Sequence, residues 1–246
     1  MKKIYSRSEF EDARKQGAEN MHQDQSLRNK ALDVFIEADR HNWIHQTNWL
    51  GEPSLQTPED LITFQEIIFR TKPDFLLEVG VAWAGSLLFY ATIMESIGHG
   101  QIIGIDIFIP DDLKGRIFSH SVSKRIKLIQ SSSIEDDSFQ EISGMIGENK
   151  NTMVHLDSDH TDEHVFKELS MYSELVSKEN YLICGDTIID FIPEQTHRPR
   201  EWGKTNNPNT ALKRFLKVNN RFEVDQTYDK KRLMSNQPGG YLRCIK

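Results

Sequence analysis

Phe75-Leu-Leu-Glu-Val-Gly-Val-Ala-Trp-Ala-Gly-Ser86 is the stretch that decides the fold, because an apolar run leads directly into a turn of small residues. Residues 75–79 predict a buried strand. Gly80, Ala82 and Gly85 keep the spacing of G-x-G-x-x-G, with alanine in the middle position. Residues without bulk let the backbone approach a nucleoside cofactor, although they also serve plain helix–strand packing.

Short apolar runs alternate with amphipathic helices after this turn. The expected strands are 75–79, 101–106, 126–130, 152–156 and 181–184, and the expected helices are 86–97, 138–146, 164–176 and 209–218. This alternation predicts a parallel sheet buried on both faces. Two further runs, 222–227 and 241–245, have no helix expected between them and should pair antiparallel. The pattern favours a Rossmann-like, class I methyltransferase α/β fold over a fully parallel dehydrogenase.

The first 70 residues predict an N-terminal helical or cap segment, followed by one Rossmann-like domain over residues 71–246. Leu27, Ala31, Val34, Phe35 and Ala38 form an apolar stripe at helical spacing. A second helix is expected from Thr57 as its N-cap to about residue 70.

Bulk composition restricts the class of protein. The chain has 246 residues and a formal net charge of −7, and it shows no basic surface for nucleic acid. Its two cysteines, Cys184 and Cys244, lie in strand-like runs and should be buried thiols. The N-terminus is too charged for a signal peptide, and no apolar stretch is long enough for a membrane span. We therefore expect a cytoplasmic protein.

Polar residues after three strands predict a nucleoside site. Asp106 ends the second strand, where a carboxylate can accept hydrogen bonds from ribose hydroxyls. Glu78, beside the small-residue turn, suits the cationic, amino-acid-bearing S-adenosylmethionine better than a pyrophosphate. Ser132, within a run of three serines after strand 126–130, is expected to face the adenine. Ser86 begins the helix after the turn.

Two acids follow the next two strands. Asp157 ends strand 152–156 and Asp186 follows strand 181–184, so both carboxylates should converge at one sheet edge. Oxygen ligands favour a hard cation such as Mg²⁺. His160 is then the candidate general base. A zinc trio of Asp157, His160 and His164 is the alternative, because His164 follows His160 by one helical turn.

These residues make the chain resemble the cephalosporin hydroxylase family, which includes sugar O-methyltransferases of macrolide biosynthesis and rhamnosyl O-methyltransferases. The resemblance covers about residues 43 to 243. Its matching stretches are Trp49-Leu-Gly51, Pro58-Glu-Asp60-Leu, Gln65-Glu-Ile-Ile68, Leu77-Glu-Val-Gly80, Ala84-Gly85-Ser86, Ile103-Gly-Ile-Asp106, Leu156-Asp-Ser-Asp-His160, His164-Val165, Glu168-Leu169, Tyr172, Tyr181 to Thr187, and Gly239-Gly240-Tyr241-Leu242-Arg243.

The resemblance implies S-adenosylmethionine on Glu78, Gly80, Ser86 and Asp106. It also implies Mg²⁺ on Asp157 and Asp186, with His160 as base, and methyl transfer to a sugar hydroxyl by a homo-oligomer. Asp157 is thus expected to serve the metal, the cofactor and catalysis together. One departure stands out: the family usually has Glu-Asp where this chain has Gly185-Asp186. Asp159 or water would then complete the metal site, or the metal would be absent.

Three other functions stay open at this stage: an NAD-dependent oxidoreductase, a metal-dependent hydrolase and a non-catalytic cofactor-binding protein. The long segment 186–209 is expected to form a lid over the acceptor. It contains His197, Arg198, Arg200 and Trp202, and its two arginines suit a phosphate or carboxylate. Trp43 and Trp49 are read either as covers of the cofactor or sugar or as core residues.

Overall fold

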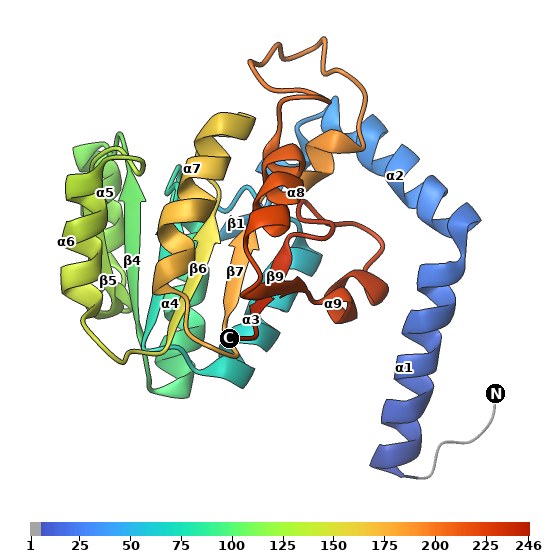
Figure 1. Cartoon of the computed structure of the whole chain (residues 1–246), viewed down its shortest axis with the longest axis horizontal. Coiled ribbons are helices and arrows are strands. Elements are labelled where there is room, and N and C mark those ends of the chain that lie inside the picture. The colour runs from blue at the N-terminus through green and yellow to red at the C-terminus, as the bar shows by residue number, and fades with distance from the viewer. Residues whose placement is uncertain (1–5) are drawn as a thin grey trace.

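The computed structural model describes residues 6–246 and is built around a seven-stranded sheet (Figure 1). The strand order is β5-β4-β3-β6-β7-β9-β8. The strands are β3 (Phe75–Val79), β4 (Gln101–Asp106), β5 (Ile126–Gln130), β6 (Thr152–Leu156), β7 (Tyr181–Cys184), β8 (Phe222–Val224) and β9 (Tyr241–Cys244). Only β9 runs antiparallel to its neighbours β7 and β8. The predicted mostly parallel sheet with an antiparallel C-terminal strand is therefore confirmed.

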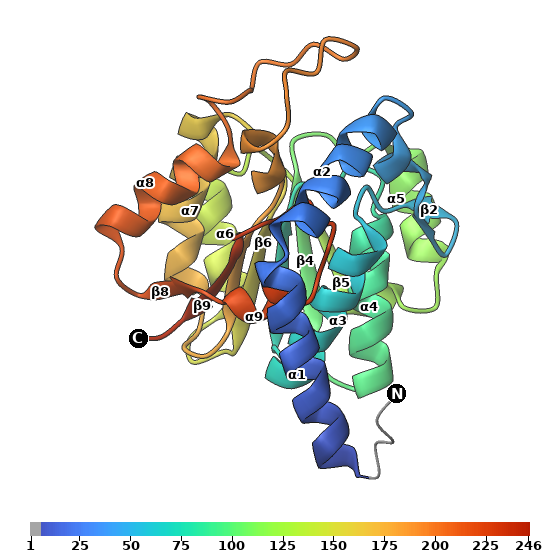
Figure 2. The same ribbon diagram turned by 90° about the vertical axis from the view of Figure 1, so that its right-hand side faces the viewer.

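Helices cover both faces of the sheet, as Figure 2 shows. One layer contains α3 (Pro58–Thr71), α4 (Gly85–Ile97) and α5 (Asp111–Ser119), and the other contains α6 (Asp136–Ile146), α7 (Asp162–Tyr172) and α8 (Pro208–Val218). Neighbouring residues of a strand point to opposite faces. Leu76 accordingly packs in the first core and Leu77 in the second, and both are fully buried. This two-sided burial explains why the strands read as continuous apolar runs.

Two helices of the structure were not expected from the sequence. Helix α5 was not expected, because only Leu113 and Ile117 of its residues are buried and the apolar pattern is short. A five-residue helix, α9 (Gln226–Lys230), lies between β8 and β9, where no helix was expected. The Asp225 side chain accepts a hydrogen bond from the Thr227 amide, so helix capping ends β8 earlier than predicted.

The N-terminal helices α1 (Arg7–Gln23) and α2 (Gln25–Asp39) form an arm beside the sheet (Figure 1). Helix α1 begins with a capping box between Ser6 and Glu9 and buries none of its residues. Ala31 and Phe35 of the predicted stripe are buried, whereas Val34 is 54% exposed, so that part of the stripe was wrong. Helix α3 packs in the core with α4, and the domain boundary at residue 70 stays a prediction.

Between the arm and the sheet, the chain forms a 3-10 turn, η1 (Trp43–Gln46), and a small antiparallel pair, β1 (Asn48–Trp49) and β2 (Glu52–Pro53). Trp49 packs edge-on against Phe89 and donates a hydrogen bond to Thr92, which fits its core reading. The remaining 3-10 turns are η2 (Ser123–Arg125), η3 (Ser173–Leu175) and η4 (Thr187–Asp190).

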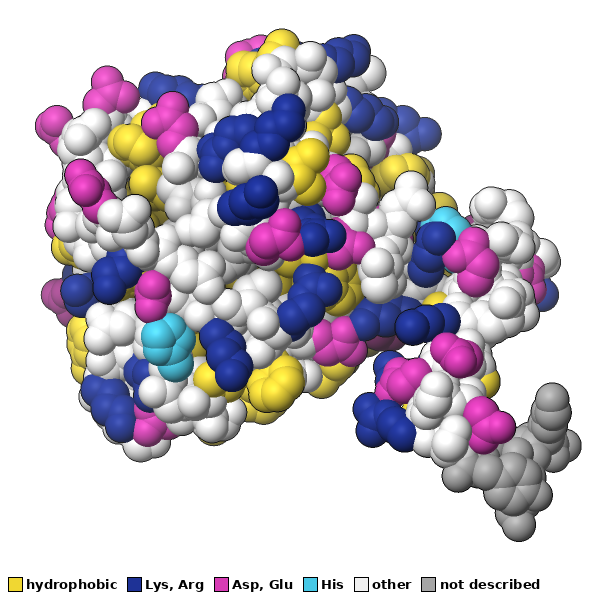
Figure 3. All heavy atoms as spheres, turned by 60° about the horizontal axis from the view of Figure 1, so that its bottom comes forward, with side chains coloured by type: hydrophobic (Ala, Val, Ile, Leu, Met, Phe, Trp, Pro, Cys, Tyr) yellow, Lys and Arg dark blue, Asp and Glu magenta, His cyan; other side chains and the backbone are white. Residues whose placement is uncertain are grey.

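The surface at the bottom of Figure 1 carries mixed charge. Figure 3 shows Lys and Arg side chains intermixed with Asp and Glu over this face. Cys184 and Cys244 are both buried free thiols, as predicted. Within residues 6–246, no helix combines the length and apolar character that crossing a bilayer demands.

Candidate active site

Two cavities open where β3, β4, β6 and β7 end. The lid-side cavity, of about 270 Å³, is lined by His160, Asp186 and residues of segment 186–209. The β4-side cavity, of about 320 Å³, is lined by Asp106, Ser132 and His164. Both are also lined by four residues that follow β3 and β6: Gly80, Ala82, Asp157 and Ser158. The two cavities therefore meet at the carboxyl ends of neighbouring parallel strands, where open α/β sheets place ligands.

The turn after β3 requires glycine at position 80. Gly80 has φ +96°, and a Cβ there would lie 2.1 Å from the backbone oxygen of Asp157. The amides of Val81 and Ala82 donate hydrogen bonds to one Asp106 oxygen at 2.8 and 3.1 Å. The Phe108 amide donates to the other at 3.0 Å. Asp106 thus fixes the turn while its carboxylate lines the β4-side cavity.

The other predicted cofactor residues occupy different surroundings. Ser86 lines the lid-side cavity. Gly85 lines neither cavity, and a Cβ on it would lie 2.4 Å from the backbone of Pro53, so close packing on β2 accounts for this glycine. Glu78 also lines neither cavity and lies 3.7 Å from His155 Nδ1. Burial raises the pKa of Glu78, and its Oε2 has no hydrogen-bond partner among the described residues.

The structure brings Asp157, His160 and Asp186 together, with one ligand atom from each lying within 4.8 Å of the others. His160 Nε2 lies 3.2 Å from Asp186 Oδ2. Burial, and then the charge of Asp186, raise the pKa of Asp157 to about 8. Two crowded carboxylates destabilise each other's charged form, and a cation between them would relieve that repulsion. The donor set and its electrostatics therefore fit a hard divalent cation.

The local backbone places Asp186 in this three-residue cluster and keeps Asp159 out of it. Asp186 has φ +49°, and this left-handed residue is the N-cap of η4, two positions after β7 ends. Asp159 instead accepts hydrogen bonds from the amide and hydroxyl of Thr161, at 2.8 and 2.5 Å, before α7 begins. It is absent from the metal-ligand group found in residues 6–246, so the sequence-based alternative of Asp159 as a ligand is not supported.

The zinc trio considered from the sequence is not formed. His164 Nε2 lies 3.1 Å from Glu168 Oε1 and 3.2 Å from Ser133 Oγ, on the β4 side of the site. It does not belong to the group formed by Asp157, His160 and Asp186 in the described part of the chain. The helical spacing from His160 to His164 did not apply because α7 begins only at Asp162.

Gln56 is a site residue that the sequence analysis missed. Its Nε2 donates a 2.7 Å hydrogen bond to Asp157 Oδ2, and its Oε1 accepts one of 2.8 Å from Gln237. Gln56 and Gln237 are both buried. This amide pair holds Asp157 Oδ2, and no hydrogen bond from residues 6–246 reaches Oδ1. The sequence does not indicate this contact, because 101 positions separate Gln56 from Asp157.

Gly185 explains part of the departure from the family pattern. A Cβ at this position would lie 2.7 Å from both Asp157 Oδ1 and the backbone oxygen of Leu156. In this chain the position therefore leaves room for Asp157 rather than for a third carboxylate.

We expect Gly185→Ala to lower the free energy of unfolding by about 1–3 kcal/mol, because the backbone of Leu156 cannot yield as a flexible side chain would. Gly144→Ala is the matched control, since Gly144 lies within α6 with no atom within 4 Å of its Cβ position. That control should be stabilised by about 0.5–1 kcal/mol. Urea unfolding measures both, and equal stabilisation of the two variants would contradict the crowding at Gly185.

Segment 186–209 covers one side of the lid-side cavity, and its role as a lid over the acceptor stays a prediction. Gln195, Arg198, Arg200 and Trp202 line this cavity. Trp202 packs edge-on against His160, with ring centroids 4.8 Å apart. Its contact restricts the orientation of the imidazole.

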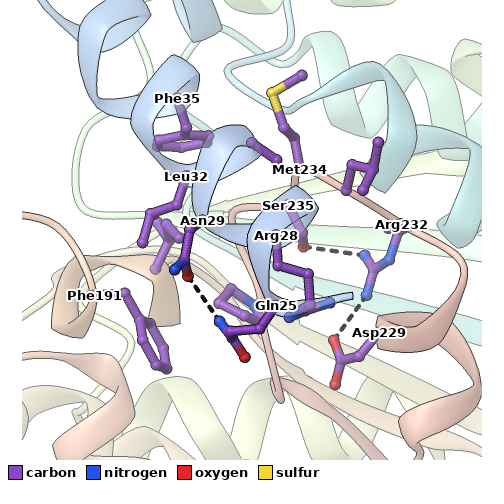
Figure 4. A pocket seen from close by; sticks show the side chains of 14 residues that line it. Gln25, Arg28, Asn29, Leu32, Phe35, Phe191, Asp229, Arg232, Met234 and Ser235 are labelled. Carbon is purple, nitrogen blue, oxygen red and sulfur yellow. Dashed lines mark hydrogen bonds and ion pairs between the residues drawn. The ribbon is translucent and has the colours of Figure 1, made fainter. Parts of the chain in front are cut away.

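An adjoining cavity of about 280 Å³ lies between α2 and segment 229–238 (Figure 4). It shares Phe35 and Ile188 with the lid-side cavity. Its wall combines apolar side chains such as Leu32 and Met234 with polar groups. Arg232 donates hydrogen bonds to Ser235 and Asp229 within the 229–238 wall, at 3.1 and 3.2 Å.

A mostly parallel sheet with an antiparallel C-terminal strand and two joined cavities at its strand ends defines a Rossmann-like class I methyltransferase. Residues 41–245 match the family described as Rhamnosyl O-methyltransferase/CmcI. The chain belongs to this family.

Known proteins agree with this assignment. The chain is 27% identical over 167 residues to the Rhamnosyl O-methyltransferase of Mycobacterium leprae. This match covers 64% of this chain and 70% of that protein. An apo structure of CmcI matches with a TM-score of 0.58 and 18% identity, over 82% of this chain and 77% of that one. A CmcI structure with Mg and S-adenosylmethionine matches with a TM-score of 0.57 and 17% identity. This match covers 82% of this chain and 78% of that one. The predicted fold class, family and O-methyltransferase activity are confirmed.

Proposed function

We propose that the protein transfers the methyl group of S-adenosylmethionine to a hydroxyl of a saccharide or glycosylated small molecule. The wall shared by the two cavities, formed by Gly80, Ala82, Asp157 and Ser158, carries this proposal. A methyl donor in the β4-side cavity and an acceptor in the lid-side cavity would meet there. The match to a rhamnosyl O-methyltransferase supports a sugar as the acceptor.

In this proposal the β4-side cavity holds the nucleoside. Asp106 accepts hydrogen bonds from the ribose, and Ser132 borders the adenine. Gly80 and Ser86 line the lid-side cavity and would lie toward the methionine end. Glu78 lines neither cavity, but its Oε2, which has no hydrogen-bond partner among the described residues, stays the predicted acceptor for the amino group. Gly85 supports the turn by packing on β2 rather than by contact with the cofactor.

Asp157 and Asp186 would hold Mg²⁺, and Gln56 would keep Asp157 oriented toward it. Bound there, the ion would lower the pKa of a nearby hydroxyl. Two carboxylates are a usual protein contribution to a Mg²⁺ site, with water completing the coordination. The CmcI structure with Mg and S-adenosylmethionine supports this assignment.

His160 would act as the general base. Its Nε2, held beside Asp186 and Trp202, takes the proton of the acceptor hydroxyl. The oxygen then forms a bond to the methyl carbon while the carbon–sulfur bond breaks, leaving a neutral thioether. Most of the rate gain in such a transfer comes from holding the two reactants in line.

The adjoining cavity beyond Phe35 and Ile188 would accept the remainder of a larger acceptor. Its apolar residues suit the non-sugar part of a glycosylated molecule (Figure 4). Assembly into a homo-oligomer and a cytoplasmic location stay predictions from the sequence.

Calorimetric titration tests the cofactor assignment. We expect S-adenosylmethionine and S-adenosylhomocysteine to bind the purified protein and NAD⁺ not to bind, because the β4-side cavity leads to a methyl-transfer site. Mg²⁺ should bind the wild-type protein and bind at least about tenfold more weakly to Asp186→Asn, which removes one charged ligand. Binding of NAD⁺ alone would favour the oxidoreductase reading. Binding of the sulfur nucleosides without turnover of any hydroxylated acceptor would favour a non-catalytic protein.

A further inference from the structure

Three side chains of the lid-side cavity, two of them cationic, have no part in the methyl transfer described above. His45 of η1 and Arg198 and Arg200 of segment 186–209 all line this cavity. The pKa of His45 is lowered, first by its burial and then by the charges of Arg198 and Arg200. The two guanidinium groups therefore lie close enough to His45 to disfavour its protonated form.

Arg198 is held in place by Asp39, the buried last residue of α2. Asp39 accepts hydrogen bonds from Arg198 at 2.6 Å and from Gln195 at 2.5 Å, and its carboxylate lies 3.2 Å from His197 Nε2. One acid thus fastens three residues of the segment to the arm. The buried Nε of Arg198 has no hydrogen-bond partner among residues 6–246. An acceptor oxygen from a ligand would satisfy this donor.

Arg200 carries a charge that no carboxylate in the described residues balances. Its guanidinium lies over the Trp202 ring, 5.3 Å from the centroid, and no ion pair of Arg200 occurs within residues 6–246. Trp202 in turn lies edge-on to His160. A single indole ring therefore separates the free guanidinium from the proposed base.

We propose that the acceptor sugar carries an oxyanion, a carboxylate or a phosphate, which Arg198 and Arg200 bind. This inference rests on the proposed function. Guanidinium groups bind such oxyanions with paired, charge-assisted hydrogen bonds. The carboxylates of Asp157 and Asp186 line the same cavity and repel an anion from their own side of it. The acceptor is thereby oriented with its oxyanion at the lid and a ring hydroxyl at His160.

The test compares three probes on one sugar scaffold: a neutral methyl hexoside, the corresponding hexuronic acid and the hexose 1-phosphate. Each is titrated calorimetrically into protein loaded with S-adenosylhomocysteine, so the measurement needs no turnover. We expect Arg200→Gln to weaken binding of an anionic probe by about 10- to 100-fold, the effect of one charged hydrogen bond. Binding of the neutral hexoside should not change.

Lys204→Gln is the matched control, because Lys204 is an exposed cation of the same segment that does not line the lid-side cavity. It should bind all three probes like the wild type. The acid and the phosphate separate the two possible sources of the oxyanion. Equal affinity for neutral and anionic probes, or equal effects of Arg200→Gln and Lys204→Gln, would overturn the inference. Failure of the sulfur nucleosides to bind would instead overturn the proposed function.

Discussion

His160→Ala is expected to lower the rate of methyl transfer by about 10²- to 10⁴-fold, the usual contribution of a general base. Affinity for S-adenosylmethionine should change little, because His160 lines the lid-side cavity and not the β4-side cavity. Release of S-adenosylhomocysteine measures the rate, and calorimetry measures the affinity. Added imidazole should restore part of the activity, since it supplies the missing base in the space left by the side chain.

Two variants separate base chemistry from mere packing beside Trp202. His160→Gln keeps a polar side chain next to Asp186 but has no basic nitrogen, and it should be as slow as His160→Ala. His41→Ala removes an exposed histidine outside the cavities and should keep the wild-type rate. If His160→Gln turned over like the wild type, proton removal would have to be assigned to another group.

The sequence predicted the sheet well because its strands are buried on both sides. Leu76 and Leu77 must both be apolar when each faces a helix layer, so the strand appears as an uninterrupted run. The elements that escaped prediction are short and mostly exposed. Helix α5 buries Leu113 and Ile117, and α9 buries Tyr228 alone. Such elements depend on capping and on tertiary contacts rather than on periodicity.

The candidate site residues that directly follow a strand could be predicted from the sequence. Asp106, Asp157 and Asp186 each follow a recognisable strand, and topology alone brings those ends to one edge of the sheet. Gln56 and Asp39 were not predictable, because each acts through a partner more than 100 positions away. Gly85 was predicted as a cofactor residue from its spacing, but the structure gives it a packing role against Pro53. Spacing alone therefore did not separate a binding glycine from a packing glycine.

Asp60→Ala is expected to lower the free energy of unfolding by about 3–5 kcal/mol, the usual cost of breaking a buried ion pair by removing one partner. Asp60 is fully buried and pairs with Arg232, which is 4% exposed. It also accepts hydrogen bonds from Ser235 Oγ and the Asn236 amide at 2.7 Å, and from the Tyr241 hydroxyl at 3.0 Å. One carboxylate of α3 thus holds the C-terminal segment. Urea unfolding measures the loss.

The pair itself is tested by a second substitution. Asp60→Ala combined with Arg232→Met should be less destabilised than Asp60→Ala alone, because it removes a buried cation that would keep only its 3.2 Å pair with Asp229. Asp111→Ala, which loses a 3.3 Å ion pair on a nearly fully exposed acid, should change stability by no more than about 1 kcal/mol. Because Gln237 follows Asn236 and bonds to Gln56, loosening this segment should also disturb Asp157. Weaker Mg²⁺ binding by folded Asp60→Ala would link the stability of α3 to the site, and unchanged binding would show that Gln56 holds Asp157 without that support.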